Sequence, residues 1–180
     1  MNLGAIKSLC QGGRRATIYN NGQEQWISCG TGAYLVEGVR IVGAQALMEL
    51  WNLTDKARDK ADITLEEVSD SRFTVQVCED EEELRELGGV VWGDGVYYIA
   101  LQSENGVLWV DARYFRPLRE DYRQYYARWS YGRPLIAVYE NMADGCKALV
   151  YPTDDKTANR LQAMATEMKG PPYLWNDGEA

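Results

Sequence analysis

The chain of 180 residues contains no histidine. Histidine activates the nucleophile in Ser-His and Cys-His sites, is the commonest general base and is a frequent ligand of zinc. Its absence excludes these catalytic arrangements and the commonest zinc sites. We therefore expect no metal dependence and no cofactor. An enzyme with this sequence would have to work through carboxylates, lysine, tyrosine or cysteine alone.

Long apolar runs and paired cysteines are also missing. No run approaches the roughly 20 apolar residues of a membrane-spanning helix. Residues 1–10 lack the apolar core and the cleavage site of a signal peptide. The cysteines lie far apart and form no Cys-x-x-Cys pair: Cys10, Cys29, Cys78 and Cys146. These absences predict a cytoplasmic protein without membrane contact, whose thiols stay free as small core residues.

The common phosphate-binding and calcium-binding motifs are absent, and Gly30-Thr31-Gly32 lacks the third glycine of a dinucleotide fingerprint. With 46% apolar and 26% charged residues, the composition is that of an ordinary globular domain. The net charge of −8 is uneven, because residues 61–110 hold twelve acidic and two basic groups. Residues 1–60 and 111–150 each carry a small positive excess, so a basic face remains available on an acidic protein.

One sequence pattern occurs twice, at residues 13–21 and 132–141. Each copy follows a helix-like stretch, begins with Gly-Arg, runs through apolar residues to a tyrosine and stops at asparagine. A polar turn and a second apolar run follow, at residues 25–29 and 146–151. The repeat predicts two units that superpose, each a helix followed by an antiparallel pair of strands.

Other elements follow from apolar spacing, capping residues and turn residues. We expect helices at residues 3–10, 43–53 and 154–168, and strands at residues 16–19, 25–29, 33–37, 72–78, 90–92, 97–102, 107–110, 135–139 and 146–151. The acidic run from Asp80 to Glu83 admits two interpretations, a carboxylate cluster that binds metal or the first turn of a helix. The helical turn is favoured, because acidic residues suit a helix N-terminus and neighbouring carboxylates do not converge on one point.

The segment from Asp111 to Trp129 is predicted to be mainly helical. At 100° per residue, its tyrosines and Trp129 fall on one face of the helix. We expect Tyr122, Tyr126 and Trp129 on this face to be buried. The opposite face carries Arg113, Arg116, Arg119 and Arg123. If the helix begins at Pro117, Arg113 leaves this stripe. The stripe suits contact with phosphates, but it could also be a solvated helix face that is partly balanced by neighbouring acids.

The segment from Leu108 to Phe115 resembles the strand-to-helix signature of bacterial DNA polymerase sliding clamps. In that family an Asn-Ala-Lys-Tyr-Leu type sequence opens the helix. Pro134-Leu135-Ile136 and Ala148-Leu149-Val150-Tyr151-Pro152 are similar to the proline-bearing strand and the closing strand that follow. The resemblance covers residues 107–153, and residues 1–40 more loosely. A clamp chain holds about three such domains, so this chain would be a divergent member of the phage or mobile-element type.

The resemblance implies an α+β fold, an antiparallel sheet with helices on one side, built from a duplicated helix-plus-strands unit. Residues 1–153 would form this clamp-like domain, in halves of about 1–68 and 69–153, and residues 154–180 a C-terminal helix and tail. Clamp helices turn basic residues towards DNA. Carried over, this places Arg116, Arg119, Arg123 and Lys7 on the DNA side.

These observations predict a non-enzymatic binding protein of DNA transactions that acts by oligomerisation or partner docking. Its nucleic-acid-binding residues would be Arg113, Arg116, Arg119, Arg123 and Lys7. Its partners would be duplex DNA and further copies of itself. The alternatives are a clamp-fold protein-interaction module without a DNA role, and an enzyme that works without histidine.

Overall fold

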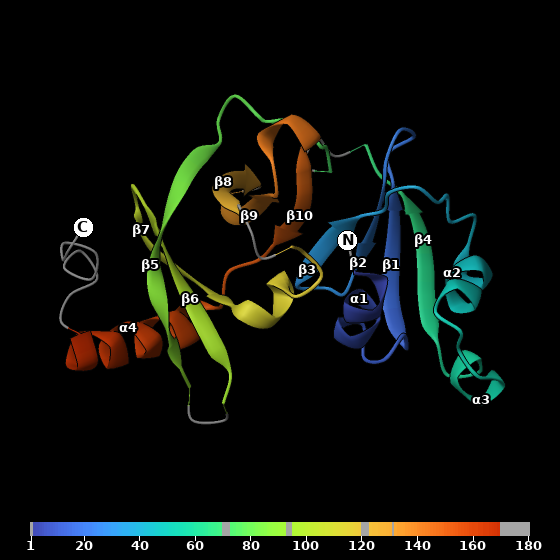
Figure 1. Ribbon diagram of the computed structural model, residues 1–180, viewed down its shortest axis with the longest axis horizontal. Coiled ribbons are helices and arrows are strands. Elements are labelled where there is room, and N and C mark those ends of the chain that lie inside the picture. Colours follow the sequence, from blue (N-terminus) through green and yellow to red (C-terminus); the bar gives the residue numbers. More distant parts are fainter. Residues whose placement is uncertain (1, 70–72, 93–94, 120–122, 131, 170–180) are drawn as a thin grey trace.

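The computed structural model describes residues 2–69, 73–92, 95–119, 123–130 and 132–169 (Figure 1). Their helices are α1 (Leu3–Leu9), α2 (Ala44–Leu50), α3 (Asp55–Arg58) and α4 (Asp155–Lys169), with short 3-10 turns η1 (Ala112–Phe115) and η2 (Met142–Asp144). Their strands are β1 (Arg15–Asn20), β2 (Gln25–Ser28), β3 (Gly32–Leu35), β4 (Asp62–Glu67), β5 (Glu82–Val91), β6 (Tyr97–Ser103), β7 (Gly106–Asp111), β8 (Gln124–Ser130), β9 (Arg133–Tyr139) and β10 (Cys146–Val150).

The strands form one ten-stranded sheet in the order β4-β1-β2-β3-β10-β9-β8-β5-β6-β7. All neighbouring pairs are antiparallel except β1 and β4, which run parallel from Arg15 opposite Asp62 to Asn20 opposite Glu67. The predicted α+β class is therefore confirmed, but the sheet is mixed and not wholly antiparallel. Strand β4 was missed, because its side chains are almost all exposed and the only apolar residues in it are Ile63 and Leu65.

Strand β5 bends and so joins two parts of the sheet. Glu82–Leu84 pair with β8, whereas β5 pairs with β6 from Arg85 onwards. The register shifts between Glu86 and Gly88, and Gly88 takes a φ of 98°, which favours glycine. A bulge of this kind bends a strand. The ribbon of β5, β6 and β7 consequently stands at one end of the molecule, and β1–β4 stand at the other (Figure 1).

The main core lies on one face of the sheet. Helices α1 and α2 place Ile6 and Leu47 in it, and both side chains are fully buried. Strands β1, β9 and β7 add Ile18, Ile136 and Val110 to the same cluster. Strands at both ends of the sheet therefore share one apolar core, whose burial is the main source of stability.

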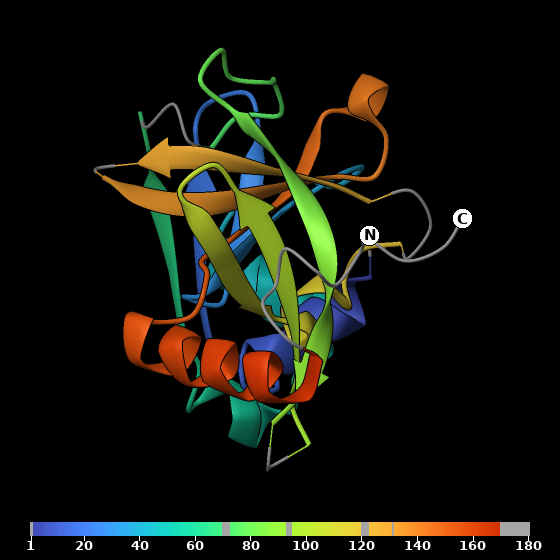
Figure 2. The same ribbon diagram turned by 90° about the vertical axis from the view of Figure 1, so that its left-hand side faces the viewer.

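Helix α4 covers the other face of the β5–β7 ribbon, as Figure 2 shows. Leu161 and Ala165 are fully buried and pack in a cluster with Ala100 of β6 and Trp109 of β7. The neighbours of Ala100 in β6 face the main core, because successive side chains of a strand point to opposite faces. Helices therefore lie on both faces of the sheet, and the expectation of helices on one side was wrong. No helix in the described part of the chain is long and apolar enough to cross a bilayer.

The helix starts agree with the capping residues in the sequence, which are Asn2 for the first helix and Thr153 or Asp154 for the last. The Asn2 side chain accepts a hydrogen bond from the Ala5 N–H at 3.0 Å and caps α1. The Asp154 carboxylate accepts one from the Thr157 N–H at 2.9 Å and caps α4. Both caps act within one turn, so the sequence was sufficient to predict the cap of α1 and to narrow that of α4 to two neighbouring residues.

The half-buried strand predicted at residues 72–78 is irregular over residues 73–78, which we call the strap, and Arg72 lies outside the described residues. Phe73 and Val75 do pack into an apolar cluster, as their alternation indicated. Most of the strap's hydrogen bonds go to side chains, however. Asn21 donates to the Phe73 carbonyl at 2.5 Å, and Glu24 accepts from the Val75 N–H at 3.3 Å. Without a neighbouring strand to form a ladder, the alternating sequence does not become a strand.

Two predicted helices are strands instead. Glu82 and Glu83, assigned to a helical turn, belong to β5 and pair with β8. The long helix predicted within 111–129 is replaced by the short turn η1, which ends at Arg116 before Pro117, and then by strand β8. Both faces of β8 are covered, so its apolar residues show no period of two that would reveal a strand.

Both copies of the Gly-Arg pattern open a hairpin. The pairs β1–β2 and β9–β10 are antiparallel hairpins, as the repeated Gly-Arg pattern predicted. Helix α1 precedes the first hairpin, but strand β8 precedes the second, so the expected second helix was wrong. That the two units superpose stays a prediction.

Candidate nucleic-acid interface

The predicted basic residues do not share a helix, yet three of them meet at one place. Arg113, Arg116 and Arg123 line a hollow of about 520 Å³, together with Tyr97 at the start of β6. We call this hollow the arginine hollow. Turn η1 forms one wall of the hollow. The turn starts at Asp111, whose carboxylate accepts a hydrogen bond from the Arg113 N–H at 2.9 Å.

Arg113 is held at the rim by the residue that ends β7. Its Nε and Nη2 donate to the two oxygens of Asp111, at 2.9 Å and 2.6 Å to Oδ2. Asp111 is largely buried whereas half of the Arg113 side chain is exposed. This hydrogen bond raises the pKa of Arg113 above its ordinary value. Arg113 is therefore fixed in place, and its charge is partly neutralised.

Arg116 caps the end of η1 and is exposed. Its side chain makes no hydrogen bond or ion pair with any residue that the structure describes. Guanidinium groups pair with phosphate in a bidentate manner and stay charged at all ordinary pH values. Arg116 is thus the arginine of the hollow that is most available to a bound anion.

Arg123 immediately precedes strand β8. Its guanidinium donates to the carbonyls of Phe115 and Leu118, both at 3.1 Å, and to that of Arg119 at 2.6 Å. It also lies over the Phe115 ring, 5.9 Å from the centroid. Carbonyl groups are neutral, so these bonds fix the guanidinium without cancelling its charge. Arg123 gives the hollow a fixed positive potential.

The other two predicted residues lie elsewhere in the fold. Arg119 is exposed, and its backbone N–H donates to Glu140 at 2.6 Å. Lys7 is half-buried, and its ammonium group donates to the Trp51 carbonyl at the end of α2 at 2.6 Å. A cation at a helix C-terminus is stabilising. Lys7 therefore ties α1 to α2, which gives it a structural role, and its contact with DNA stays a prediction.

The burial predicted beneath the arginine stripe was only partly correct. Tyr126 is half-buried, but Trp129 is 39% exposed, and Tyr122 lies outside the described residues. Tyr126 and Trp129 lie three residues apart in β8 and so point to opposite faces of the sheet. The helical angles used for the prediction do not apply to a strand.

Tyr97 is a site residue that the sequence did not reveal. It is 42% exposed, and it precedes Tyr98 in the first two positions of β6. From the sequence alone, one of these two tyrosines must face each side of the sheet, but the sequence does not say which side holds the hollow. The position of η1 beside β6 decides that Tyr97 faces it.

An acidic hollow of about 690 Å³ lies at the other end of the β5–β6 pair. It is lined by five consecutive acidic residues from Glu79 to Glu83, by Glu104, and by Arg85, Gln102 and Ser103. Strand β6 has seven residues, so Tyr97 and Ser103 are roughly 20 Å apart at about 3.4 Å per residue. Positive and negative charge are therefore separated along one ribbon. Among the described residues, no group of three or more potential ligands is arranged to hold a metal.

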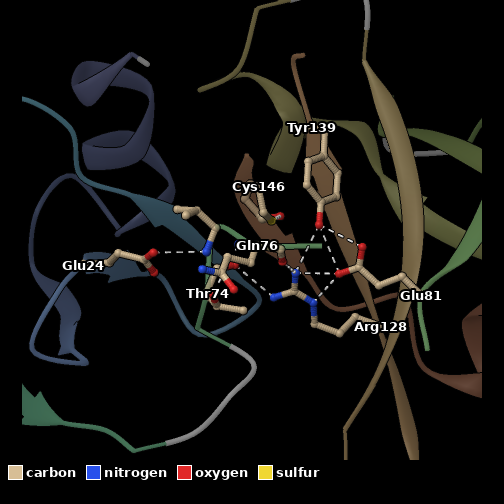
Figure 3. A network of polar contacts seen from close by, with 9 residues as sticks. Glu24, Thr74, Gln76, Glu81, Arg128, Tyr139 and Cys146 are labelled. Carbon is tan, nitrogen blue, oxygen red and sulfur yellow. Dashed lines mark hydrogen bonds and ion pairs between the residues drawn. The ribbon is translucent and has the colours of Figure 1, made fainter. Parts of the chain in front are cut away.

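The most extensive polar network is buried and structural (Figure 3). The Arg128 guanidinium lies 2.5 Å from a Glu81 oxygen, and Glu81 also accepts the Tyr139 hydroxyl at 2.8 Å. Arg128 further donates to the strap, at 3.2 Å to the Thr74 carbonyl and 3.0 Å to the Gln76 carbonyl. The network pins the strap to the sheet.

The buried thiols are poorly suited to nucleophilic chemistry. Burial raises the pKa of Cys146 to about 12, and burial together with the nearby Cys29 raises that of Cys10 to about 12. Reactive cysteines need a lowered pKa, since the thiolate is the nucleophile. Both groups remain protonated at neutral pH and act as small core residues.

The arginine hollow is therefore the candidate site: two fixed arginines, one available arginine and an exposed tyrosine around a concave surface. No family model matches this chain, and neither a characterised protein nor a solved structure matches it.

Proposed function

We propose that this chain is a non-enzymatic binding protein of DNA transactions that contacts nucleic-acid phosphates through the arginine hollow. The observation that carries the proposal is the convergence of Arg113, Arg116 and Arg123 on one concave surface. Arginines so placed can neutralise phosphates and release their condensed counterions, which is the main source of sequence-independent affinity.

The chemistry of the remaining groups supports a binding role over a catalytic one. The buried tyrosines Tyr34 and Tyr139 have pKa values raised by burial, and the thiols of Cys10 and Cys146 are similarly protonated. Each of these groups sits in the core, where it contributes packing and hydrogen bonds. A general acid or base instead needs a pKa near the working pH and access to substrate.

The mode of contact differs from that of a sliding clamp. The resemblance implied a helix that turns its arginines towards DNA, whereas these arginines come from a 3-10 turn and the loop beyond it. The net charge of −8 also opposes binding by a single copy. We therefore propose that several copies, or this chain with a partner, bring basic hollows to one nucleic acid. Sedimentation of the complex should then show more than one chain per short DNA.

The test is a titration of fluorescently labelled DNA at about 50 mM and about 200 mM salt. We expect salt-sensitive binding that Arg116→Glu weakens at least several-fold. Arg116→Ala should flatten the dependence of log K on log salt by about one unit, the share of one phosphate contact. Arg116 makes no described side-chain contact, so both variants should keep the fold.

Arg40→Glu is the matched control, because Arg40 is exposed and lines a different hollow. It makes the same change in net charge and should weaken binding far less than Arg116→Glu. Equal losses in the two variants would mean that only overall charge matters. Absence of binding at about 50 mM salt would overturn the proposal.

A further inference from the structure

The exposed tyrosine in the wall of the arginine hollow is suited to single-stranded nucleic acid more than to a duplex. Tyr97 is 42% exposed and lines the same hollow as Arg113, Arg116 and the buried Phe115. Exposed aromatic rings beside cationic side chains are the usual platform for unstacked bases in single-stranded nucleic acid. Stacking on such a ring is tolerant of sequence, because every base has a π-face.

Glycine at position 89 leaves room for the ring of Tyr97. A Cβ atom on Gly89 would collide first with the backbone carbonyl oxygen of Tyr98, and it would lie 2.6 Å from Cζ of Tyr97 and 2.7 Å from its hydroxyl oxygen. The phenol end of the ring therefore lies against the backbone of β5. A ring seated in this way loses little conformational entropy when a base packs on its exposed side.

The size and shape of the hollow favour a single strand. Its volume of about 520 Å³ lies within the range of roughly 300–1,000 Å³ typical of small-ligand sites, so one nucleotide can enter. The bases of a duplex stay stacked inside the helix, and extruding one costs a few kcal/mol. An exposed tyrosine in a concave wall would thus go unused by a duplex.

We propose that the arginine hollow binds single-stranded nucleic acid, with one unstacked base on Tyr97 and the flanking phosphates on Arg116 and Arg113. This inference rests on the proposed function and names its ligand class. Arg123 contributes mainly its charge, because its Nε and Nη2 groups already donate to the carbonyls of Phe115, Leu118 and Arg119. Arg113 likewise uses its Nε and Nη2 groups on Asp111, so a phosphate would meet its Nη1 group.

The experiment compares a labelled thymidine dodecamer with a duplex of equal length at about 50 mM salt. We expect tighter binding of the single strand, and Tyr97→Ala should weaken it about 5- to 100-fold. Tyr97→Phe keeps the ring and should bind nearly as well as the unmodified protein. Tyr151→Ala, at a tyrosine that is 38% exposed and lines another hollow, should have little effect. If Tyr97→Ala does not fold, Tyr97→Leu serves in its place, since it fills the space beside Gly89 without a ring.

The outcomes separate the inference from the function on which it rests. Salt-sensitive binding that depends on Arg116 but is equal for duplex and single strand, or unaffected by Tyr97→Ala, overturns the inference and leaves the proposed function standing. Competition by thymidine monophosphate at the affinity of the dodecamer would make this a free-nucleotide site and overturn it too. No binding of either DNA would overturn both.

Discussion

Arg128 lies inside the protein with only 2% of its side chain exposed, a rare position for an arginine. Its charge is matched by Glu81, which is 1% exposed, and its other donors reach strap carbonyls and Tyr139. Removing two charges from water costs several kcal/mol per ion, which attraction offsets only in good geometry. The pair therefore holds the strap in one position more than it adds to overall stability.

Removal of one partner should expose this cost. Arg128→Met leaves the Glu81 carboxylate buried and unpaired, and we expect a loss of about 3–5 kcal/mol in unfolding free energy, measured in urea. The double variant Arg128→Met/Glu81→Gln should recover part of this loss. Arg15→Met is the control, because the Arg15–Asp62 pair is 72% and 68% exposed and should be worth less than about 1 kcal/mol. Similar small losses in Arg128→Met and Arg15→Met would show that the buried pair is not needed.

At the scale of elements, the strap shows how an irregular segment can be held as firmly as a strand. Its backbone is bonded from three sides, by Asn21 and Glu24 of the first hairpin turn, by Arg128 of β8, and by the Cys146 N–H of β10 at 2.8 Å. Gly145 allows this last bond. Its φ is 75°, and a Cβ there would lie 2.7 Å from the Val75 carbonyl oxygen.

Gly145→Ala should therefore destabilise the protein for two reasons, the positive φ and the collision with the strap. Gly12→Ala isolates the first reason, because Gly12 has a φ of 72° and nothing within 4 Å of its Cβ position. We expect about 1–2 kcal/mol for Gly12→Ala and a clearly larger loss for Gly145→Ala. Chymotrypsin should also cleave after Phe73 faster in Gly145→Ala alone. Equal losses and equal cleavage would mean that the strap does not depend on close approach at Gly145.

At the scale of the whole molecule, buried thiols with raised pKa values make the stability fall at alkaline pH. The thiols of Cys10 and Cys146 have pKa values raised to about 12, against 9.0 for an exposed thiol. Above about pH 9 the unfolded chain loses these protons while the native protein keeps them. Ionisation then favours unfolding, so their contribution is complete below pH 9 and is lost as the pH rises towards 12.

We therefore expect the unfolding free energy to fall between about pH 9 and pH 10.5, with a slope approaching 1.4 kcal/mol per pH unit for each thiol. Urea unfolding curves at successive pH values measure this slope. The variant Cys10→Ala/Cys146→Ala should show a shallower decline. A decline remains because burial also raises the pKa values of the other thiols and of four tyrosines: Cys29, Cys78, Tyr34, Tyr125, Tyr126 and Tyr139. Constant stability up to pH 10.5 would contradict the burial of these groups.

The charge of the molecule is organised along the β5–β7 ribbon. Sequence alone places the acidic excess in residues 61–110. The fold concentrates much of it in the hollow lined by Glu79–Glu83 and Glu104, at the opposite end of β6 from Tyr97. A nucleic acid at the arginine hollow is thus kept roughly 20 Å from this acidic end, by the rise of β6.

The sequence by itself determined the elements whose deciding residues are near neighbours in the chain. Asn2 caps α1 through the amide three residues on, and Asp154 caps α4 in the same way. The hairpin β6–β7 follows from two apolar runs on either side of the turn residues Glu104-Asn105-Gly106. Such signals act over a few residues and need no tertiary partner.

The tertiary structure alone decided β4, β8 and the strap. Strand β8 carries Tyr125 and Ala127 towards one apolar cluster, and Tyr126 towards another, so its pattern matches neither a helix nor a half-exposed strand. The strap has the alternation of a strand but no neighbour to pair with. Strand β4 has the neighbour β1 but little apolar alternation. In each case the outcome depends on what lies across the sheet.

The candidate site divides in the same way. The arginines of residues 111–128 pointed to Arg113, Arg116 and Arg123 from the sequence. The prediction placed them on a helix, however, and this helix does not form. The hollow exists because η1 packs beside the start of β6, which brings Tyr97 to residues at least sixteen positions away in sequence. Contacts between distant segments require closing long loops, which costs conformational entropy. This cost is offset only when the whole core forms, so a local sequence pattern does not reveal such contacts.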